Sequence, residues 1–218
     1  MVNYSISGQH LWLSPQRCIY WEEESALILS DLHFGKTGHF RKYGIAVPQH
    51  VYKEDLQRLV TLIQYFQPRQ LIIAGDLFHS RLNQELELFK KWRHDLSSTT
   101  IRLIMGNHDI LHQQWYQDAG IVVHEKTWEA APFLFCHDAA DCSSNALSAN
   151  YYSFTGHVHP GVSIYGLGRQ SLRFPCFYFR ENYCVLPAFS RFTGTYRIQP
   201  GDGDHVFAIV DDQILQMN

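Results

Sequence analysis

The chain has 218 residues, of which 45% are hydrophobic and 18% charged, so it is long enough for one domain with a sizeable core. Its net charge of −3 argues against a protein that coats nucleic acid by bulk electrostatics, but it leaves room for a local basic groove. No apolar run approaches the ~18 residues of a membrane span, and the first residues lack the pattern of a signal peptide. We therefore predict a single domain over residues 1–218, cytoplasmic and without membrane contact.

In the first half of the chain, short apolar runs alternate with amphipathic stretches. The runs at 26–29, 71–74 and 101–105 predict strands that are buried on both faces. Apolar residues at helical spacing predict helices over about residues 49–66 and 83–96. The second helix is expected to bury Leu86, Leu88, Phe89 and Trp92. This alternation indicates β-α-β units with parallel strands, in which ligands bind beyond the carboxyl ends of the strands.

After about residue 120 the helical pattern gives way to short strand candidates separated by turns rich in Gly, Pro and Asp. The candidates are residues 121–124, 133–136, 152–155, 162–165, 176–179, 183–186, 206–210 and 213–215. Asp211-Asp212 predicts a hairpin between the last two. We expect these strands to be mostly antiparallel and to share one core with the first half.

The chain has five cysteines and no C-x-x-C pair. An odd number of cysteines without a signal peptide predicts reduced, mostly buried thiols in a cytosolic protein. The residues concerned are Cys18, Cys136, Cys142, Cys176 and Cys184.

Polar clusters rich in histidine follow five of the apolar runs, and they hold six of the 13 histidines. Because alternate residues of an extended strand point to the same side, one cluster can offer an oxygen and a nitrogen to one metal. The clusters are Asp31-Leu32-His33, Gly75-Asp76-Leu77-Phe78-His79, Gly106-Asn107-His108-Asp109, Cys136-His137-Asp138 and Gly156-His157-Val158-His159. This is the ligand inventory of a two-metal hydrolytic site.

Counting ligands gives a partition between two metal ions. One ion is expected to take Asp31, His33, Asp76 and His159; the other is expected to take Asp76, Asn107, His137 and His157. A carboxylate such as that of Asp76 can bridge two cations. Mixed oxygen and nitrogen ligands suit Mn²⁺, the expected ion, as well as Fe²⁺ or Zn²⁺. A water held between the ions would lose a proton near neutral pH and attack phosphorus in line.

The motifs Asp-x-His, Gly-Asp-x-x-His, Gly-Asn-His-Asp and Gly-His-x-His resemble the signature of the calcineurin-like metallophosphoesterases over about residues 25–190. The resemblance implies an α/β fold, a four-layer α-β-β-α sandwich in which two mixed sheets are flanked by helices, and it implies the same metal partition. Many relatives flank the lone metal-binding histidine with small residues, whereas His137 lies between Cys136 and Asp138. Asp138 is therefore a candidate partner of the ligands.

The chain is similar to the bacterial ligase-associated DNA-damage-response metallophosphoesterases in its short length and in residues 30–36 and 75–79. Residues 75–79 are also similar to the matching segment in the nuclease subunit of double-strand-break repair complexes. The resemblance implies a DNA substrate in repair and a ligase or helicase as partner.

Three further residues beside the ligands are candidates for catalysis. His108 is expected to act as general acid or to stabilise the phosphoryl charge, with Asp109 orienting it. His79 is a second candidate for acid duty or substrate contact.

Cations and glycines over residues 35–44 are expected to contact a phosphodiester backbone, with a solvated loop as the alternative. The predicted substrate-binding residues are Lys36, His39, Arg41 and, behind the second cluster, Arg81. Five arginines of the strand-rich half are instead expected to form a solvated face, with a nucleic-acid groove as the alternative: Arg169, Arg173, Arg180, Arg191 and Arg197.

The sequence thus predicts a metal-dependent phosphodiesterase, a DNA endonuclease or exonuclease in repair. The alternative substrate is a small phosphoester: a cyclic nucleotide, a dinucleotide polyphosphate, a nucleotide-sugar pyrophosphate or a phosphoprotein. The negative net charge favours that alternative. A third hypothesis is a metal-dependent interaction module without catalysis, against which the intact Asn107 and His108 argue.

Overall fold

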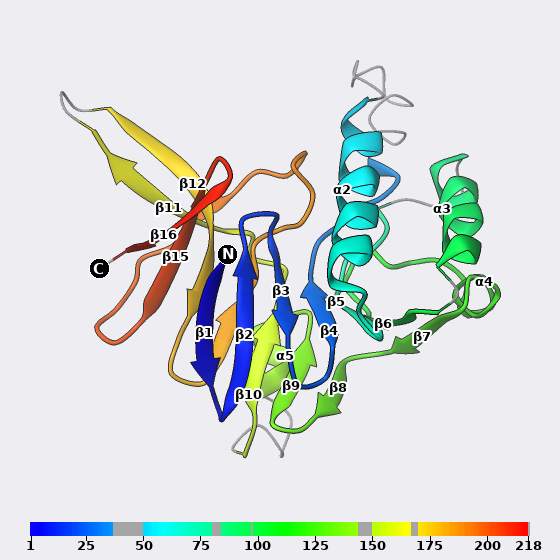
Figure 1. Ribbon diagram of the computed structural model, residues 1–218, viewed down its shortest axis with the longest axis horizontal. Helices are drawn as coiled ribbons and strands as arrows, with labels where there is room; N and C mark the ends of the chain where they lie inside the picture. The colour runs from blue at the N-terminus through cyan, green and yellow to red at the C-terminus, as the bar shows by residue number, and fades with distance from the viewer. Residues whose placement is uncertain (37–49, 80–83, 97, 144–149, 167–169, 218) are drawn as a thin grey trace.

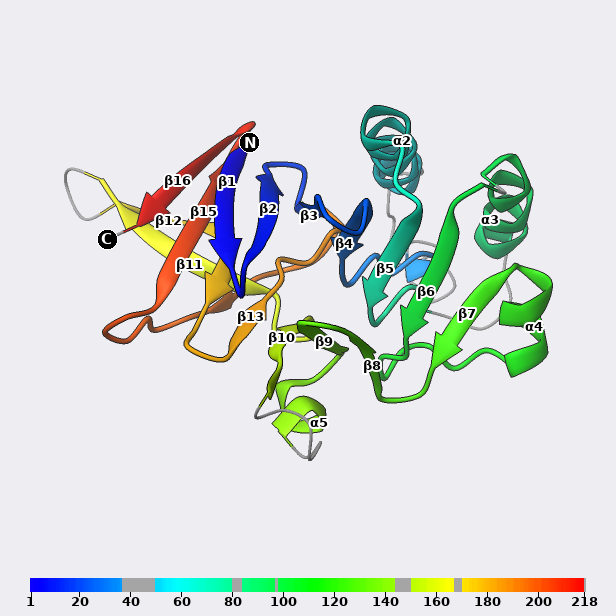
Figure 2. The same ribbon diagram turned by 60° about the horizontal axis from the view of Figure 1, so that its bottom comes forward.

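The computed structural model describes residues 1–36, 50–79, 84–96, 98–143, 150–166 and 170–217. Two sheets pack face to face, and helices cover their outer faces (Figures 1 and 2). No helix in the described part of the chain is long and apolar enough to cross a membrane.

The first sheet follows the order of the chain. Its strands are β1 (Val2–Ile6), β2 (Gln9–Ser14), β3 (Cys18–Trp21), β4 (Ala26–Leu29), β5 (Gln70–Ala74), β6 (Thr100–Ile104) and β7 (Ile121–His124). The first four strands are antiparallel neighbours, whereas β4 to β7 are parallel. The helices that connect the parallel strands are α2 (His50–Phe66), α3 (Gln84–Asp95) and α4 (Gln113–Asp118). The predicted β-α-β units are therefore confirmed.

The second sheet is built from the second half of the chain. Its strand order is β14 (Tyr196–Arg197), β11 (Pro160–Tyr165), β12 (Ser171–Phe179), β13 (Tyr183–Val185), β10 (Tyr152–Thr155), β9 (Phe133–Cys136) and β8 (Thr127–Ala130). A hairpin of β15 (His205–Val210) and β16 (Gln213–Met217) pairs with β12. The short helix α5 (Ala139–Ser143) follows β9.

Side chains of the parallel strands alternate between two apolar layers, as the period of a strand requires. Leu27 and Leu29 of β4 pack beneath the helices with Leu59 of α2 and Phe89 of α3. The alternate residue Ile28 packs between the sheets against aromatic residues of the second sheet. On the far side of the second sheet, Cys142 of α5 covers Leu134 and Cys136 of β9. The four-layer α-β-β-α sandwich implied by the resemblance is confirmed, with α5 as its short fourth layer.

The second half is mostly antiparallel, as predicted, but one helix position differs from expectation. The exceptions among the strand pairs include the centre of the sheet, where β10 pairs in parallel with both β9 and β13. Parallel neighbours need a crossover, and α5 and the β11–β12 hairpin supply it. Leu88 is 47% exposed, because it lies two positions from the buried Leu86 and so points away from the core.

The expectation of five reduced cysteines also differs from the structure. Cys136 and Cys142 form a disulfide, while Cys18, Cys176 and Cys184 are buried free thiols. The cause is α5, which turns back on β9 and brings the Cα atoms of Cys136 and Cys142 to 5.8 Å.

Candidate metal centre

The five histidine-rich clusters meet at one edge of the sandwich, where β4, β5, β6, β9 and β10 end. Backbone hydrogen bonds connect the loops that carry them. Asp31 N donates to Gly75 O at 3.1 Å, and His33 N donates to Asp76 O at 2.9 Å. Across the sheets, the backbone N–H of His157 donates to Asp31 Oδ2 at 3.1 Å. The two sheets therefore contribute to a single site.

Five of the seven expected ligand residues have a left-handed backbone conformation, which is uncommon for residues with a side chain. Such conformations cost free energy and persist where the surrounding structure fixes them. Here the hydrogen bonds between the loops do so. The φ angles are 53° at Asp31, 49° at His33, 52° at Asp76, 66° at His157 and 52° at His159.

Glycines of the motifs allow the loops to approach one another closely. A Cβ atom at Gly106 would lie 2.2 Å from Asp76 Oδ1, and one at Gly75 would lie 2.0 Å from His137 Nδ1. At Gly156 it would lie 2.7 Å from both Ala74 O and Asp31 Oδ2. Any side chain at these positions would displace a candidate ligand or the strand behind it.

The first group of candidate ligands is Asp31, His33 and His159, whose ligand atoms lie within 4.8 Å of one another. His159 Nε2 is 3.1 Å from Asp31 Oδ1 and 3.4 Å from His33 Nε2. Burial, followed by the charge of Lys36, lowers the pKa of His33 to about 2. The His33 ring is therefore neutral, which is the form that binds metals.

The second group contains Asp31, Asp76 and His137. His137 Nδ1 donates to the Ala74 carbonyl at 3.0 Å, which makes Nε2 the nitrogen that would bind an ion after it loses its proton. That nitrogen faces Asp76 Oδ2 at 3.5 Å, Asn107 Oδ1 at 3.2 Å and His157 Nδ1 at 3.2 Å. All four expected ligands of the second ion therefore converge, although Asn107 and His157 are exposed.

The electrostatic field at the second group of ligands stabilises positive charge. Burial lowers the pKa of His137, but the hydrogen bond to Asp76 and the charges of Asp31 and Asp76 raise it to about 9. Burial raises the pKa of Asp76, but His137 and the backbone N–H of His108 lower it to about 2. A divalent cation would supply the same charge to this pair of carboxylates.

Two buried ligand atoms support this fit. Among the described residues, Asp31 Oδ1 and His33 Nδ1 accept or donate no hydrogen bond, although Asp31 Oδ1 lies 3.1 Å from His159 Nε2. Buried polar atoms without partners are uncommon, and a metal ion is one of the groups that satisfies them. The residues present therefore fit divalent metal ions.

Asp76 lies between the two groups, as a bridging ligand must. Its Oδ2 atom is 3.5 Å from His137 Nε2 and 4.0 Å from His33 Nδ1, while Oδ1 accepts the backbone N–H of His108 at 2.9 Å. The residue common to both groups is Asp31. The expected sharing of Asp76 alone stays a prediction.

The candidate catalytic histidines lie together. The rings of His79 and His108 are in tilted contact with centroids 4.2 Å apart, and both lie beside the ring of His33, at 5.3 and 5.5 Å. The sequence named both residues but did not show that they are neighbours. They face the first group of ligands.

Asp109 occupies a different position from the one expected. Its carboxylate accepts the backbone N–H of Phe78 and that of Gly106, each at 3.0 Å. It therefore connects the loops after β5 and β6, and these contacts are with the backbone rather than with the His108 ring. Burial raises the pKa of Asp109 to about 7.

Of the predicted substrate-binding residues, only Lys36 is described. Its backbone N–H donates to His33 O at 3.1 Å. Burial lowers the pKa of Lys36, while the charges of Asp31 and Asp76 raise it. Lys36 is thus electrostatically coupled to both carboxylates. His39, Arg41 and Arg81 lie outside the described residues.

Sequence reasoning missed a loop that packs beside Asp31. In this loop, Phe189 N donates to Ser30 O at 2.8 Å and Ser190 N donates to Asp31 O at 3.2 Å. Asp55 of α2 accepts the Ser190 hydroxyl at 3.0 Å and pairs with Arg58 at 3.0 Å. The signal available in the sequence was an aspartate, Asp55, among the residues of a predicted amphipathic helix. The residues that it contacts are evident only from the fold.

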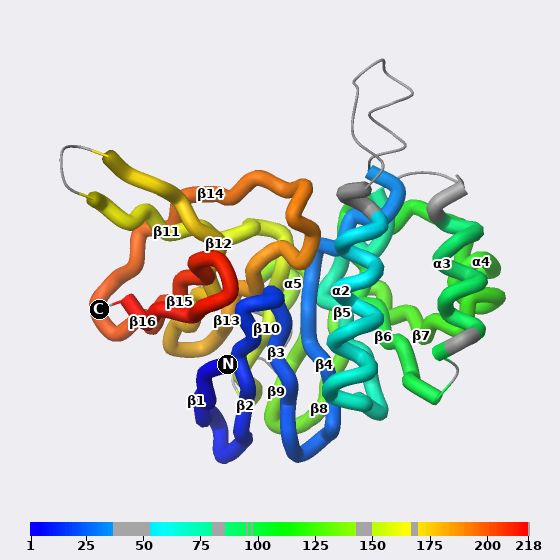
Figure 3. Tube along the Cα trace, turned by 45° about the horizontal axis from the view of Figure 1, so that its top comes forward, coloured from blue at the N-terminus to red at the C-terminus, as the bar shows by residue number. Residues whose placement is uncertain are grey.

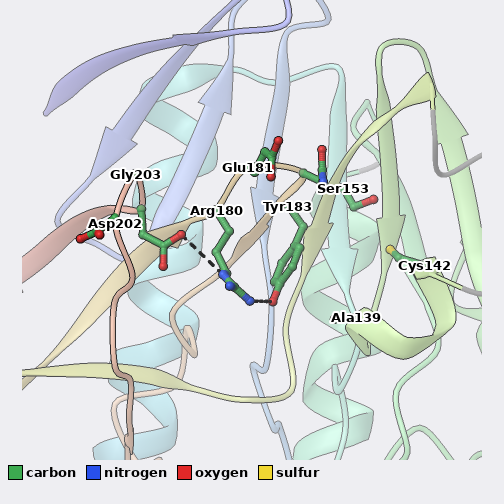
Figure 4. A pocket seen from close by; sticks show the side chains of 10 residues that line it. Ala139, Cys142, Ser153, Arg180, Glu181, Tyr183, Asp202 and Gly203 are labelled. Carbon is green, nitrogen blue, oxygen red and sulfur yellow. Dashed lines mark hydrogen bonds and ion pairs between the residues drawn. The ribbon is translucent and has the colours of Figure 1, made fainter.

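A cavity of about 810 Å³ lies elsewhere, beside α5 and the ends of β10 and β13 (Figure 4). Arg180 in its wall donates to the Tyr183 hydroxyl at 2.6 Å and lies 3.5 Å from Asp204 Oδ1. None of the expected ligand or catalytic residues lines this cavity. It is therefore separate from the metal centre.

Comparisons with known proteins agree with this geometry. The family described as calcineurin-like phosphoesterase matches residues 25–176. Among solved structures, the Pseudomonas putida nuclease MPE is similar to this chain, with a TM-score of 0.82, 29% identity and 99% of each chain covered. A search of curated proteins finds no match. The family match spans all five clusters, so the chain belongs to the calcineurin-like phosphoesterases and is a metal-dependent phosphoesterase.

Proposed function

We propose that this protein is a two-metal phosphodiesterase that cuts DNA, and that it acts in DNA repair. The observation that carries the proposal is that two ligand groups share Asp31 and that the Asp76 carboxylate lies between His33 and His137. The similar structure of a nuclease supports a nucleic-acid substrate. The motif resemblance supports repair, with a ligase or helicase as partner.

The proposed ligands follow the partition predicted from the sequence. Asp31, His33, Asp76 and His159 hold one ion, and Asp76, Asn107, His137 and His157 hold the other. When bound, two divalent cations, Mn²⁺ in this proposal, polarise the phosphoryl group and activate water for in-line attack. Ala74 O fixes the tautomer of His137, so that Nε2 faces the ion.

His108 is proposed to protonate the leaving oxygen or to stabilise the phosphoryl charge. The hydrogen bond from its backbone N–H to Asp76 holds the residue beside the centre. His79 supports the His108 ring through a tilted ring contact. Lys36 is proposed to contact the substrate phosphate, because it already lies in the field of Asp31 and Asp76.

The test is Mn²⁺-dependent cleavage of end-labelled single-stranded and duplex DNA, with a small chromogenic phosphodiester alongside. His108→Gln is expected to keep its metal content and to lower turnover by roughly 10²–10⁴-fold. Asp76→Ala is expected to lose metal and all activity, since it removes the shared ligand. Metal content is measured on each variant by elemental analysis, with exposed Lys91→Ala as the control.

The outcomes separate the hypotheses. DNA cleavage that requires Mn²⁺ and is lost in both variants supports the nuclease. Turnover of the chromogenic diester with DNA untouched keeps the metal chemistry but assigns a small phosphoester as substrate. Loss of metal from His108→Gln would contradict the role given to His108.

A further inference from the structure

A strand layer leads directly away from the metal centre. β11 begins at Pro160, the residue after the candidate ligand His159, and Tyr196 N donates to His159 O at 2.8 Å. β11 pairs with β12 on one side and with the short β14 on the other. The β11–β12 hairpin projects from the body of the protein (Figure 1), and the segment that includes β14 runs beside it (Figure 3).

The strand register places two arginines and a tyrosine on one face of this layer. Arg197 is paired with Gly161, Arg173 with Ser163, and Tyr165 with Ser171. Paired residues share a face, as do alternate residues of one strand. We call the set of Ser163, Tyr165, Ser171, Arg173 and Arg197 the basic face. The described residues of β11, β12 and β14 include no Asp or Glu, so no carboxylate of these strands offsets its charge.

The side chains of the basic face are exposed but held in place. Tyr165 is 66% exposed, and Arg173 and Arg197 are exposed as well. Arg197 Nη2 donates to the Tyr165 hydroxyl at 3.0 Å, and Arg173 Nη1 donates to Thr195 O at 3.1 Å. Each guanidinium has five N–H groups, so these bonds orient the arginines without using up their donors.

Gly161 makes this arrangement possible. A Cβ atom there would lie 2.6 Å from Thr195 Cβ and 3.1 Å from Arg173 Cδ. The missing side chain therefore lets Arg173 cross β11 to reach Thr195 O. Gly161 is the residue of this face closest in sequence to His159. Its lack of a side chain leaves room for Arg173.

The other described arginines that the sequence analysis named, Arg180 and Arg191, do not belong to the basic face. Arg180 contacts Asp204 and Tyr183 in the wall of the cavity, and Arg191 Nη2 donates to Gln16 at 3.4 Å. Arg169 lies outside the described residues. The sequence-based expectation of a solvated face is therefore revised for Arg173 and Arg197 alone.

We propose that the basic face binds the strand of nucleic acid that flanks the scissile phosphate. Arg173 and Arg197 contact phosphates, and the Tyr165 ring stacks on a base. This inference rests on the proposed nuclease function and adds the surface that holds the substrate outside the metal centre. β11 carries the face about 17 Å from Pro160 to Tyr165, at ~3.3 Å per residue, so only substrates several nucleotides long reach its end.

Binding without cleavage tests the proposal directly. Fluorescence anisotropy of labelled thymidine oligonucleotides of 2 and 20 residues is measured in excess chelator. Arg173→Ala/Arg197→Ala is expected to bind the 20-mer at least about ten-fold more weakly and to show a shallower salt dependence, since two phosphate contacts are removed. Binding of the dinucleotide is expected to stay unchanged. Lys91→Ala/Lys126→Ala removes the same charge from exposed positions of α3 and the β7–β8 turn, and it is expected to match the wild type.

Two substitutions of Tyr165 distinguish the contribution of ring stacking to binding from that of the hydroxyl group. Tyr165→Ala is expected to weaken binding of the 20-mer by about five- to a hundred-fold, whereas Tyr165→Phe keeps a stacking ring and retains most of the affinity. In cleavage assays with Mn²⁺, both the Arg173→Ala/Arg197→Ala and the Tyr165→Ala variants are expected to raise KM for the 20-mer. Neither is expected to change turnover of the small chromogenic diester, which shows that the metal centre is intact.

The possible failures are distinguishable. If the wild type cleaves the 20-mer but all basic-face variants bind it as the lysine control does, this inference falls and the nuclease function stands. If the wild type turns over the chromogenic diester but neither binds nor cleaves the 20-mer, both fall. Equal weakening of the dinucleotide and the 20-mer would also overturn the inference, because it would place the effect at the metal centre.

Discussion

Gly106 shows how strongly single residues shape the metal centre. A Cβ atom there would lie 2.2 Å from Asp76 Oδ1 and 2.5 Å from Asp76 N, so Gly106→Ala must displace the candidate bridging carboxylate. We expect this variant to lose metal affinity and to lower phosphodiester turnover by roughly 10²-fold or more, because a misplacement of about 1 Å can cost that much. Isothermal titration with Mn²⁺ and a diester assay measure both effects.

Gly194→Ala is the matched control for that substitution. A Cβ atom at Gly194 would contact nothing within 4 Å, so this variant is expected to keep wild-type metal affinity and activity. Wild-type metal affinity in Gly106→Ala would show that the loop after β6 can shift without disturbing Asp76, contrary to the packing described here.

At the residue scale, the sequence identified the candidate ligands but not their supports. Asp31, His33 and the later histidines stand out because the motif places metal-binding side chains after apolar strands. The partner of His137 Nδ1 is the backbone carbonyl of Ala74, 63 residues away, and a carbonyl carries no sequence signal. For the same reason, the contacts of Asp109 with two backbone N–H groups could not be predicted.

At the scale of elements, α2 is connected to the metal centre through a buried ion pair. Asp55 and Arg58 lie 3.0 Å apart with side chains 5% and 9% exposed. Burial raises the pKa of Asp55 and lowers that of Arg58 to about 10, so desolvation opposes both charges. Such a pair adds little stability by itself, but removal of one partner leaves the other buried and unpaired.

We therefore expect Asp55→Ala to destabilise the fold by about 3 kcal/mol. It should also lower activity, because the Ser190 hydroxyl loses its acceptor while the Ser190 backbone holds Asp31. Urea unfolding and diester turnover measure the two effects. Glu54→Ala, on an exposed neighbour in the same helix, is expected to change neither. If Asp55→Ala is as stable as Glu54→Ala, the pair has no structural role.

Prediction of the elements succeeded where strands are short apolar runs. Residues 26–29, 121–124, 133–136 and 152–155 match the bounds of β4, β7, β9 and β10, because an apolar run stops where polar residues begin. The strands β1 to β3 were not predicted. In β1 partly buried residues alternate with exposed ones, so its pattern is an alternation rather than a run. Parallel pairing in the second sheet depends on crossovers, which the strand sequences themselves do not encode.

At the scale of the whole molecule, one apolar layer joins the two sheets. Trp21 of β3 contacts Phe133 of β9 with ring centroids 4.7 Å apart, and Phe133 contacts Phe154 of β10 at 5.0 Å. All three side chains are at most 1% exposed. Because each sheet supplies half of this layer, we propose that neither sheet is stable alone and that residues 1–218 form the single domain predicted from the sequence.

Phe133→Ala tests this proposal, because it removes a ring from the middle of the shared layer. We expect the variant to lose about 3–5 kcal/mol of stability, as for other large-to-small core substitutions. The two sheets should still unfold together, so far-UV circular dichroism and tryptophan fluorescence should report the same midpoint in urea. Tyr65→Ala, at a 67% exposed position of α2, is the control and should leave the midpoint unchanged. Separate midpoints for the two probes in the wild type or in Phe133→Ala would show that the sheets are independent units, and the metal centre would then lie between two domains.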